Sequence, residues 1–224
     1  MLKLNKKEIL RYLGYKRSHE LSDDIDDLIE KEIVEVQEAS NPRYMYQIFF
    51  CHPDEENKTI IVDGTNLVLT GNSIYKHLRY AKKVALLATT LGIEIEQVIR
   101  RYEIIDLTRS LVLDASCTEF IEKLCDLAEC DIEVSVRDEG LTLNRRFSPG
   151  YGDLPLAIQP TFLKTIKADT KLGISLTDTM LMIPRKSVTA IIGLFEDKEL
   201  ALPKRKQNKC LSCEMEDCNF RIGG

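Results

Sequence analysis

Arginine, glycine and an aromatic residue occur together in one short turn at residues 145–155, a combination typical of a ligand-binding loop. Gly150 and Gly152 can adopt positive φ angles or let a ligand approach the backbone closely. Arg146 offers a planar fork that suits a carboxylate, and Tyr151 offers a flat face with a polar tip. The same residue types also form ordinary surface turns, so composition alone leaves both interpretations open.

Three cysteines in the polar C-terminal stretch form a second group that could do chemistry. Their spacing, C-x-x-C-x-x-x-x-C, lets soft thiolates wrap one metal ion or cluster, and zinc and iron–sulfur centres are not separable on this pattern. A closed site needs a fourth ligand, which Cys51, His52, another chain or an exogenous ligand would have to supply. Chance clustering of cysteines in a tail is the alternative interpretation. The three candidate metal ligands are Cys210, Cys213 and Cys218.

The overall composition limits the classes of function. The chain has 224 residues, 44% of them hydrophobic and 30% charged, which is ordinary for a globular protein of one large or two small domains. Its net charge of -5 argues against a nucleic-acid partner, because phosphate binding needs a surplus of lysine and arginine. We expect no membrane segment and no signal peptide, and therefore a cytoplasmic protein. Seven cysteines, an odd number, do not suit a closed disulfide framework.

Several common catalytic motifs are absent from the sequence. No G-x-G-x-x-G or Walker-type glycine loop occurs, which argues against a Rossmann methyltransferase or a nucleotide hydrolase. The three histidines are scattered, and His77, on a helical pattern, is expected to be structural or solvent-facing.

Capping residues and helical periodicity predict two helices at the start of the chain. Asn5 can cap a first helix that stops at Gly14, and Ser22 can cap a second that runs to about residue 39. Acidic residues crowd the first turn of the second helix, where the helix dipole favours negative charge. They could suggest a metal, but a solvated first turn is the preferred interpretation. These residues are Asp23, Asp24, Asp26 and Asp27.

Runs of β-branched and aromatic residues predict strands on both sides of a helical centre. The alternation at residues 132–136 fits a strand while its flanks fit a helix, and we predict helix there. Strands both early and late indicate a mixed α+β fold rather than a regular βαβ alternation. Strands are expected at residues 44–51, 59–62, 67–69, 84–90, 174–182 and 187–195, and helices at 73–80 with Ser73 as the cap, 93–105, about 108–128 with a possible extension towards 140, and a short segment from Pro160.

Residues 146–151 resemble the arginine-x-x-proline-glycine-tyrosine motif of the activation domain of cobalamin-dependent methionine synthase, which binds S-adenosylmethionine. Three other segments agree with that family in order and spacing, so the resemblance covers roughly residues 80 to 195. Residues 11–15 are similar to the opening of stand-alone versions of this domain. The three supporting segments are residues 86–92 with an alanine-threonine-x-glycine strand end, a helix that opens at 113–115, and residues 176–188 from threonine-acid through methionine-x-proline to serine-valine.

The resemblance implies an α+β fold with a twisted antiparallel sheet and flanking helices, like the methionine synthase activation domain. It implies an N-terminal helical segment at residues 1–40, an activation-domain-like core at 41–200 and a cysteine-containing tail at 201–224. The chain would then be an accessory part of a methyltransferase rather than a complete enzyme.

The resemblance also implies a role in methionine biosynthesis. In this family the corrinoid cobalt is occasionally oxidised to an inactive state, and reductive methylation with S-adenosylmethionine repairs it. Arg146 would meet the ligand's carboxylate and Glu122 its positive groups, while Tyr151 would form a catalytic wall beside the reacting centre. Glu119, one turn earlier, is the alternative acidic contact. The expected ligand contacts are Arg146, Ser148, Gly150, Tyr151 and Glu122.

The implied partners are a separate methionine synthase protein that holds cobalamin and an electron donor such as flavodoxin or ferredoxin. Two alternatives stay open. The chain could activate another corrinoid-dependent methyltransferase, with the cysteine tail as a metal or iron–sulfur redox centre. It could also be a scaffold that binds S-adenosylmethionine without taking part in catalysis.

The sequence departs from the family pattern at three points. Gly152 and Asp153 stand where the multidomain enzymes have a proline and a small residue. The stretch that follows the last expected strand has no counterpart of their tyrosine pair, and their N-terminal acidic ligand contact cannot be placed. We therefore expect an incomplete binding site, either with a weaker affinity for S-adenosylmethionine or with its missing contacts supplied by the partner that carries cobalamin.

Overall fold

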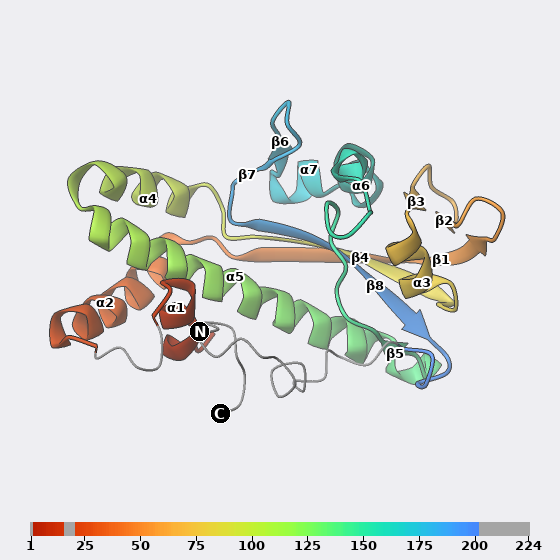
Figure 1. Ribbon diagram of the computed structural model, residues 1–224, viewed down its shortest axis with the longest axis horizontal. Coiled ribbons are helices and arrows are strands. Elements are labelled where there is room, and N and C mark those ends of the chain that lie inside the picture. Colours follow the sequence, from red (N-terminus) through yellow and green to blue (C-terminus); the bar gives the residue numbers. More distant parts are fainter. Residues whose placement is uncertain (1, 16–20, 202–224) are drawn as a thin grey trace, which may run out of the picture.

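The chain forms a six-stranded antiparallel sheet with helices on both faces. The computed structural model describes residues 2–15 and 21–201, and Figure 1 shows how their elements are arranged. The strands of the sheet follow the order β3-β2-β1-β4-β8-β5, and each neighbouring pair is antiparallel. The strands are β1 (Arg43–Asp54), β2 (Thr59–Val62), β3 (Val68–Thr70), β4 (Lys83–Thr90), β5 (Thr142–Leu143) and β8 (Ser187–Phe195), with β6 (Ser175–Leu176) and β7 (Met182–Ile183) in a separate hairpin.

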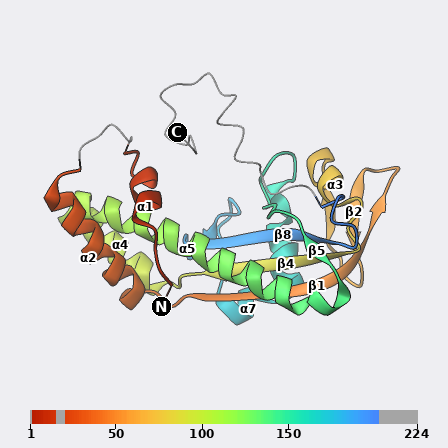
Figure 2. The ribbon, with the colours of Figure 1, turned by 90° about the horizontal axis from the view of Figure 1, so that it is seen from below.

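Two helical layers cover the sheet. The long helix α5 (Leu107–Ser135) crosses one face, while α6 (Gln159–Ile166) and α7 (Ala168–Leu172) cover the other, as the two views in Figures 1 and 2 show. Successive side chains of a strand point to opposite faces, so β8 contributes to a core on each side. Ala190, Ile192 and Leu194 pack with α5 residues such as Ala128 and Ile132, whereas Ile191 and Phe195 pack with α6 residues such as Phe162 and Ile166.

A third core lies among the helices at one end of the molecule. Here α1 (Lys6–Tyr12), α2 (Asp23–Ala39) and α4 (Glu94–Ile105) pack on the N-terminal half of α5. Fully buried side chains such as Ile9 and Ile29 fill the space between them. These helices therefore hold α5 at its N-terminal end, while the sheet holds it further along.

The short helix α3 (Asn72–Leu78) packs beside β2 and β3. Its Ile74, Tyr75 and Leu78 side chains are buried in the same core as α6. Two 3-10 turns, Arg137–Glu139 and Leu156–Ile158, connect the longer elements.

Most of the expected elements are confirmed, and so is the α+β fold with an antiparallel sheet. Residues 132–136 are helical up to Ser135, because α5 continues without a break. The prediction of a single strand at residues 174–182 is wrong. Only β6 and β7 pair there, and the chain turns between them: the Thr177 hydroxyl accepts from the backbone N–H of Leu181, and Met180 adopts a positive φ of 65°.

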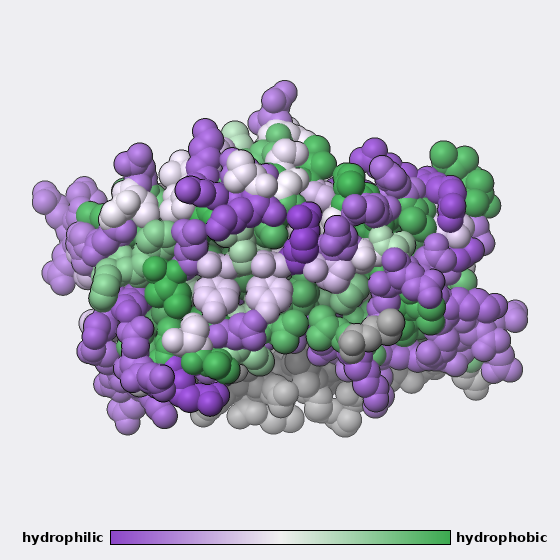
Figure 3. Space-filling model, turned by 180° about the vertical axis from the view of Figure 1, so that it is seen from behind, coloured by the Kyte–Doolittle hydropathy of each residue, from purple (hydrophilic) through white to green (hydrophobic). Residues whose placement is uncertain are grey.

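The surface mixes polar and apolar groups. In Figure 3 hydrophilic side chains cover much of both ends and also cross the middle of the face, with apolar patches between them. None of the helices within the described residues combines the length and the apolar character needed to cross a membrane.

A buried ion pair joins α2 to α5. The Glu32 side chain is fully buried, and its Oε1 lies 2.7 Å from Nε of Arg109, whose guanidinium group also stacks 4.0 Å from the centre of the Tyr102 ring. The second oxygen of Glu32 is buried without a hydrogen-bond partner among the described residues. Burial raises the pKa of Glu32, and the bond to Arg109 opposes that rise. The carboxylate therefore depends on Arg109 to stay charged.

We predict that Arg109→Met destabilises the protein by about 3 kcal/mol, because it leaves a buried carboxylate without a counter-charge. Arg101→Met is the matched control, since Arg101 is 59% exposed and 3.9 Å from Glu35; it should cost less than about 1 kcal/mol. Urea denaturation of both variants measures the difference. Equal losses of unfolding free energy in the two variants would show that the Glu32–Arg109 ion pair stabilises the protein no more than an exposed ion pair does.

Candidate functional site

An edge segment that follows β5 runs along the outer side of β8 with one residue too many for regular pairing. Leu143 pairs with Leu194, and Phe147 pairs with Ile191. Four steps along the edge segment therefore match only three steps along β8. This extra residue is a β-bulge, a feature that bends the strand and re-aims its side chains.

The bulge decides which way Arg146 points. Leu143 packs on the α5 side of the sheet, so regular alternation would direct Asn144 and Arg146 to the opposite side. Asn144 does point that way, towards α3. The extra residue then reverses the pattern, so that Arg146 faces α5 and Phe147 enters the core shared with α6.

Arg146 lies against a row of carboxylates on α5. Its Nη2 is 3.0 Å from Glu122 and 3.4 Å from Asp126, and its Nε is 3.2 Å from Glu129. The spacing of these three acids, four and then three residues apart, places them on one face of a helix. The Arg146 side chain is only 23% exposed, and its Nη1 is buried with no hydrogen-bond partner among the described residues.

The charge around Arg146 is negative overall. Three carboxylates surround the guanidinium group, and Lys123, 3.8 Å from Asp126, adds one further positive charge. Burial lowers the pKa of Arg146, but the acidic neighbours raise it by more. The guanidinium group therefore stays charged, and the surroundings favour a ligand with positive groups of its own.

Two of the carboxylates were not expected from the sequence. Glu122 was expected at the site, and it does contact Arg146. Asp126 and Glu129 follow from Glu122 by helical spacing alone, so the signal was present in the predicted helix. Glu119 instead accepts from the backbone N–H of Asn5 at 3.1 Å, and it ties the N-terminal segment to α5.

The loop after Arg146 is held by its own backbone. Gly150 adopts a φ of 83°, and its N–H donates to the carbonyl of Leu154 at 2.9 Å. The carbonyl of Ser148 accepts from the N–H of Tyr151 at 3.0 Å. These two backbone groups, at positions expected to bind a ligand, are thus engaged within the loop.

Tyr151 and Arg146 lie on different sides of the edge segment. The Tyr151 side chain is 57% exposed, and its ring packs edge-on against Phe147 with 5.3 Å between centroids. Phe147 points away from α5, opposite to Arg146. The structure therefore brings Arg146 and Glu122 together, and it places Tyr151 with Phe147 instead.

Asp153 anchors the far end of the loop to α3. Its carboxylate accepts from the backbone N–H of Ser73 at 2.9 and 3.2 Å. Helix α3 begins after Gly71, which offers no side-chain cap, so Asp153 caps the helix from 80 residues away. Ser73 is therefore not the cap that the sequence predicted. A side chain at Gly71 would lie 2.7 Å from Asp153, which explains why the close approach needs glycine there.

His77 and Asn144 hold the bulge from the α3 side. Nε2 of His77 donates to the carbonyl of Arg145 at 2.9 Å. Asn144 donates from its side chain to the carbonyl of His77 at 3.0 Å and accepts from the N–H of Gly193 at 2.7 Å. His77 is 2% exposed, and burial lowers its pKa to about 4. It is therefore a neutral, buried residue.

The expected metal ligands lie outside the described residues. Cys210, Cys213 and Cys218 belong to the stretch at 202–224. Among residues 2–15 and 21–201 no group of histidine, cysteine or acidic residues could hold a metal ion. Cys51, considered as a fourth ligand, is buried, and burial raises the pKa of its thiol to about 12. His52 pairs with Asp63 at 2.7 Å.

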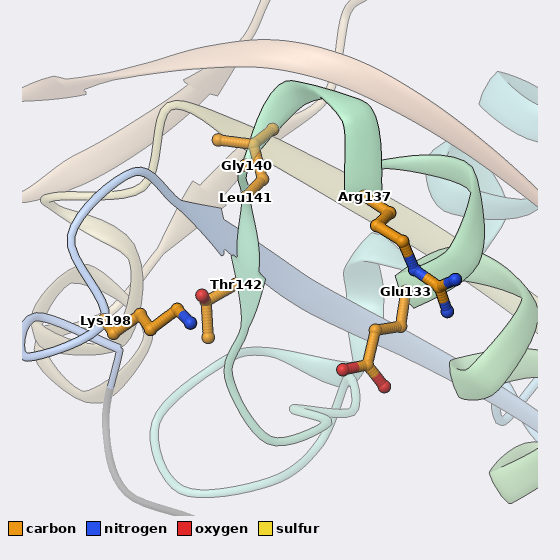
Figure 4. A pocket seen from close by; sticks show the side chains of 6 residues that line it. All are labelled: Glu133, Arg137, Gly140, Leu141, Thr142 and Lys198. Atoms are coloured by element: carbon orange, nitrogen blue, oxygen red, sulfur yellow. The ribbon is translucent and has the colours of Figure 1, made fainter.

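Two open cavities have linings that do not include Arg146. One, of about 290 Å³, is bounded by the end of α5, the turn after it, β5 and Lys198. Figure 4 shows the Lys198 amine directed towards Thr142, with Glu133 and Arg137 on the other side. The second cavity, of about 420 Å³, is lined by Phe49, the β2–β3 turn and α6. Neither contains the residues that the sequence singled out.

The architecture belongs to the class of α+β domains in which helices cover an antiparallel sheet. Within that class it is similar to the MetH reactivation domain bound to AdoHcy, with a TM-score of 0.64 and 13% sequence identity, over 87% of this chain and 74% of that chain. No family model and no curated protein matches the sequence. The likeness shows the fold that the sequence resemblance implied.

We predict that titration of His77 lowers stability in acid. Its pKa is about 4 in the folded protein and ordinarily 6.5, so the unfolded chain binds the proton more readily. The free energy of unfolding must then fall as the pH drops from about 6.5 towards 4. Denaturation curves of the wild type and His77→Gln, which cannot titrate, measure this contribution as a difference in slope against pH. If the unfolding free energy of the two proteins falls in parallel with pH, His77 makes no such contribution.

Proposed function

We propose that this chain binds S-adenosylmethionine at the Arg146 cluster and supports the reductive methylation of a corrinoid held by a partner protein. Support comes from the shared fold of a reactivation domain bound to AdoHcy and from the loop motif at residues 146–151. The Arg146–Glu122 contact adds support from the site itself. The chain is then an accessory module of cobalamin-dependent methionine synthase.

One observation carries the proposal: Nη1 of Arg146 is buried and lacks a hydrogen-bond partner among the described residues. A buried donor of this kind is costly unless an acceptor arrives. A carboxylate is the natural acceptor, because its hydrogen bond to a guanidinium N–H is charge-assisted. The α5 carboxylates occupy Nη2 and Nε, so a ligand carboxylate can bind Nη1 without displacing them once the atoms that cover Nη1 move aside.

The carboxylates give the site its preference for the remaining groups of the ligand. S-adenosylmethionine carries a positive ammonium and a positive sulfonium group, and it supplies the methyl group when bound. Glu122, Asp126 and Glu129 offer the complementary charge, and Arg146 fixes the orientation. Tyr151, exposed beside the loop, is assigned to the side that meets the partner. Positioning, rather than covalent chemistry by this chain, is its contribution.

The corrinoid partner and the reductant define the remaining steps of the proposal. Cobalamin is assigned to a separate methionine synthase protein, and the electron to a donor such as flavodoxin or ferredoxin. Reconstitution with an inactive, oxidised corrinoid protein and a reductant tests this assignment through the recovery of methylcobalamin absorbance. Recovery with a different corrinoid methyltransferase alone would favour that partner, and binding without recovery would favour a scaffold.

We predict that Arg146→Ala weakens S-adenosylmethionine binding by about ten- to hundredfold, the loss expected for a charge-assisted hydrogen bond. Isothermal titration calorimetry measures it directly. Arg145→Ala is the matched control, because Arg145 is adjacent, exposed and separate from the carboxylate row; its affinity should stay close to that of the wild type. Absence of binding heat in the wild type would sink the proposal, and equal losses in both variants would move the site elsewhere.

We also predict that the site prefers S-adenosylmethionine to S-adenosylhomocysteine. The sulfonium compound carries one more positive charge than the thioether, and the three carboxylates attract that charge. Asp126→Asn should reduce the affinity ratio by about two- to threefold, and added salt should reduce it further.

Asp138→Asn is the control for this prediction, since Asp138 is an exposed acid beyond the end of α5. Competition titrations with both ligands, at low and at high salt, measure the ratio in each variant. If the affinity ratio changes neither in Asp126→Asn nor with added salt, charge does not select the ligand.

A further inference from the structure

The bulge beside Arg146 leaves backbone groups that the sheet cannot satisfy. In the irregular stretch between the Leu143 and Phe147 pairings, the N–H of Gly193 bonds to the side chain of Asn144 at 2.7 Å rather than to a backbone carbonyl. The carbonyl of Arg145 likewise bonds to Nε2 of His77 at 2.9 Å. Side chains therefore satisfy two backbone groups at the bulge, while the N–H of Asn144 keeps its backbone bond to the carbonyl of Gly193 at 3.1 Å.

The His77 bond acts on the peptide unit that precedes Arg146. That unit contains the Arg145 carbonyl and the Arg146 N–H, and it is planar. A bond that fixes the carbonyl direction thus restricts the direction in which the Cα–Cβ bond of Arg146 leaves the backbone. The His77 ring is itself held, 5.2 Å from the Phe147 ring and 2% exposed. His77 cannot follow a shift of the loop without disturbing the core.

Gly193 completes the arrangement on β8. A Cβ atom there would lie 2.8 Å from the Leu78 side chain and 3.1 Å from the amide nitrogen of Asn144. The absence of a side chain lets the Asn144 amide reach both Gly193 and the carbonyl of His77. Three residues from three elements, α3, the edge segment and β8, thus meet at the bulge.

We propose that His77 is a positioning residue for the ligand site: by holding the Arg145 carbonyl it maintains the bulge that turns Arg146 towards the α5 carboxylates. This inference rests on the proposed function for its effect on ligand binding. The effect on Arg146 itself does not depend on any ligand. His77 does not contact the carboxylate row, so its influence passes through the backbone.

The test compares His77→Gln with His77→Met. The two side chains have similar length and volume, but only glutamine carries a donor that can reach the Arg145 carbonyl. We expect S-adenosylmethionine affinity to fall about three- to tenfold in His77→Met, the range for one lost hydrogen bond, and to recover in His77→Gln. Circular dichroism at the titration temperature confirms that both variants are folded. His77→Phe, which keeps a ring but has no donor, replaces His77→Met if that variant unfolds.

A second measurement separates this inference from the proposed function. The Nε–H of Arg146 gives a nitrogen-correlated NMR signal, assigned by its loss in Arg146→Lys, and its contact with Glu129 should slow its exchange with water. We expect exchange to be faster in His77→Met and restored in His77→Gln, with no ligand present. Folded His77→Met with wild-type affinity and exchange would overturn the inference. If the wild-type protein binds no ligand, but Arg146 exchange is still faster in His77→Met than in the wild type and His77→Gln, only the proposed function is overturned.

Discussion

One extra residue at the edge of the sheet determines what the rest of the site can be. Regular pairing from Leu143 onward would direct Arg146 away from α5 and its carboxylates. The bulge reverses the direction within three residues, before pairing resumes at Phe147. Everything attributed to Arg146, including its ion pairs and its buried Nη1, follows from that single change of register.

The carboxylate row then imposes its own constraint on a ligand. Arg146 is held by three acids, so a ligand that had to displace them all would lose much of the energy it gained. Binding through Nη1 avoids this cost and leaves the acids free to attract positive groups. A site that holds one buried cation among several anions is thus better suited to a zwitterion with an extra positive charge than to a simple anion.

The sequence was sufficient for the parts of the site that depend on local pattern. Helical spacing predicted α5, the motif at residues 146–151 singled out Arg146, and the resemblance to the activation-domain family implied that Glu122 belongs to the same site. The bulge was not predictable in the same way, because it appears only when two strands distant in sequence are aligned. For the same reason the placement of Tyr151 on Phe147, and the capping of α3 by Asp153, came only from the structure.

The two halves of the site are held by different cores, and this has a mechanical consequence. Helix α3 fixes the edge segment at both ends, through His77 at Arg145 and through the N–H of Ser73 at Asp153, and its apolar side chains share the α6 core. The carboxylates belong to α5, which packs on the opposite face of the sheet. Arg146 is the side chain that spans the two layers at this edge. A displacement of α5 relative to the sheet would therefore change the Arg146 contacts first, while the loop stayed in place on α3.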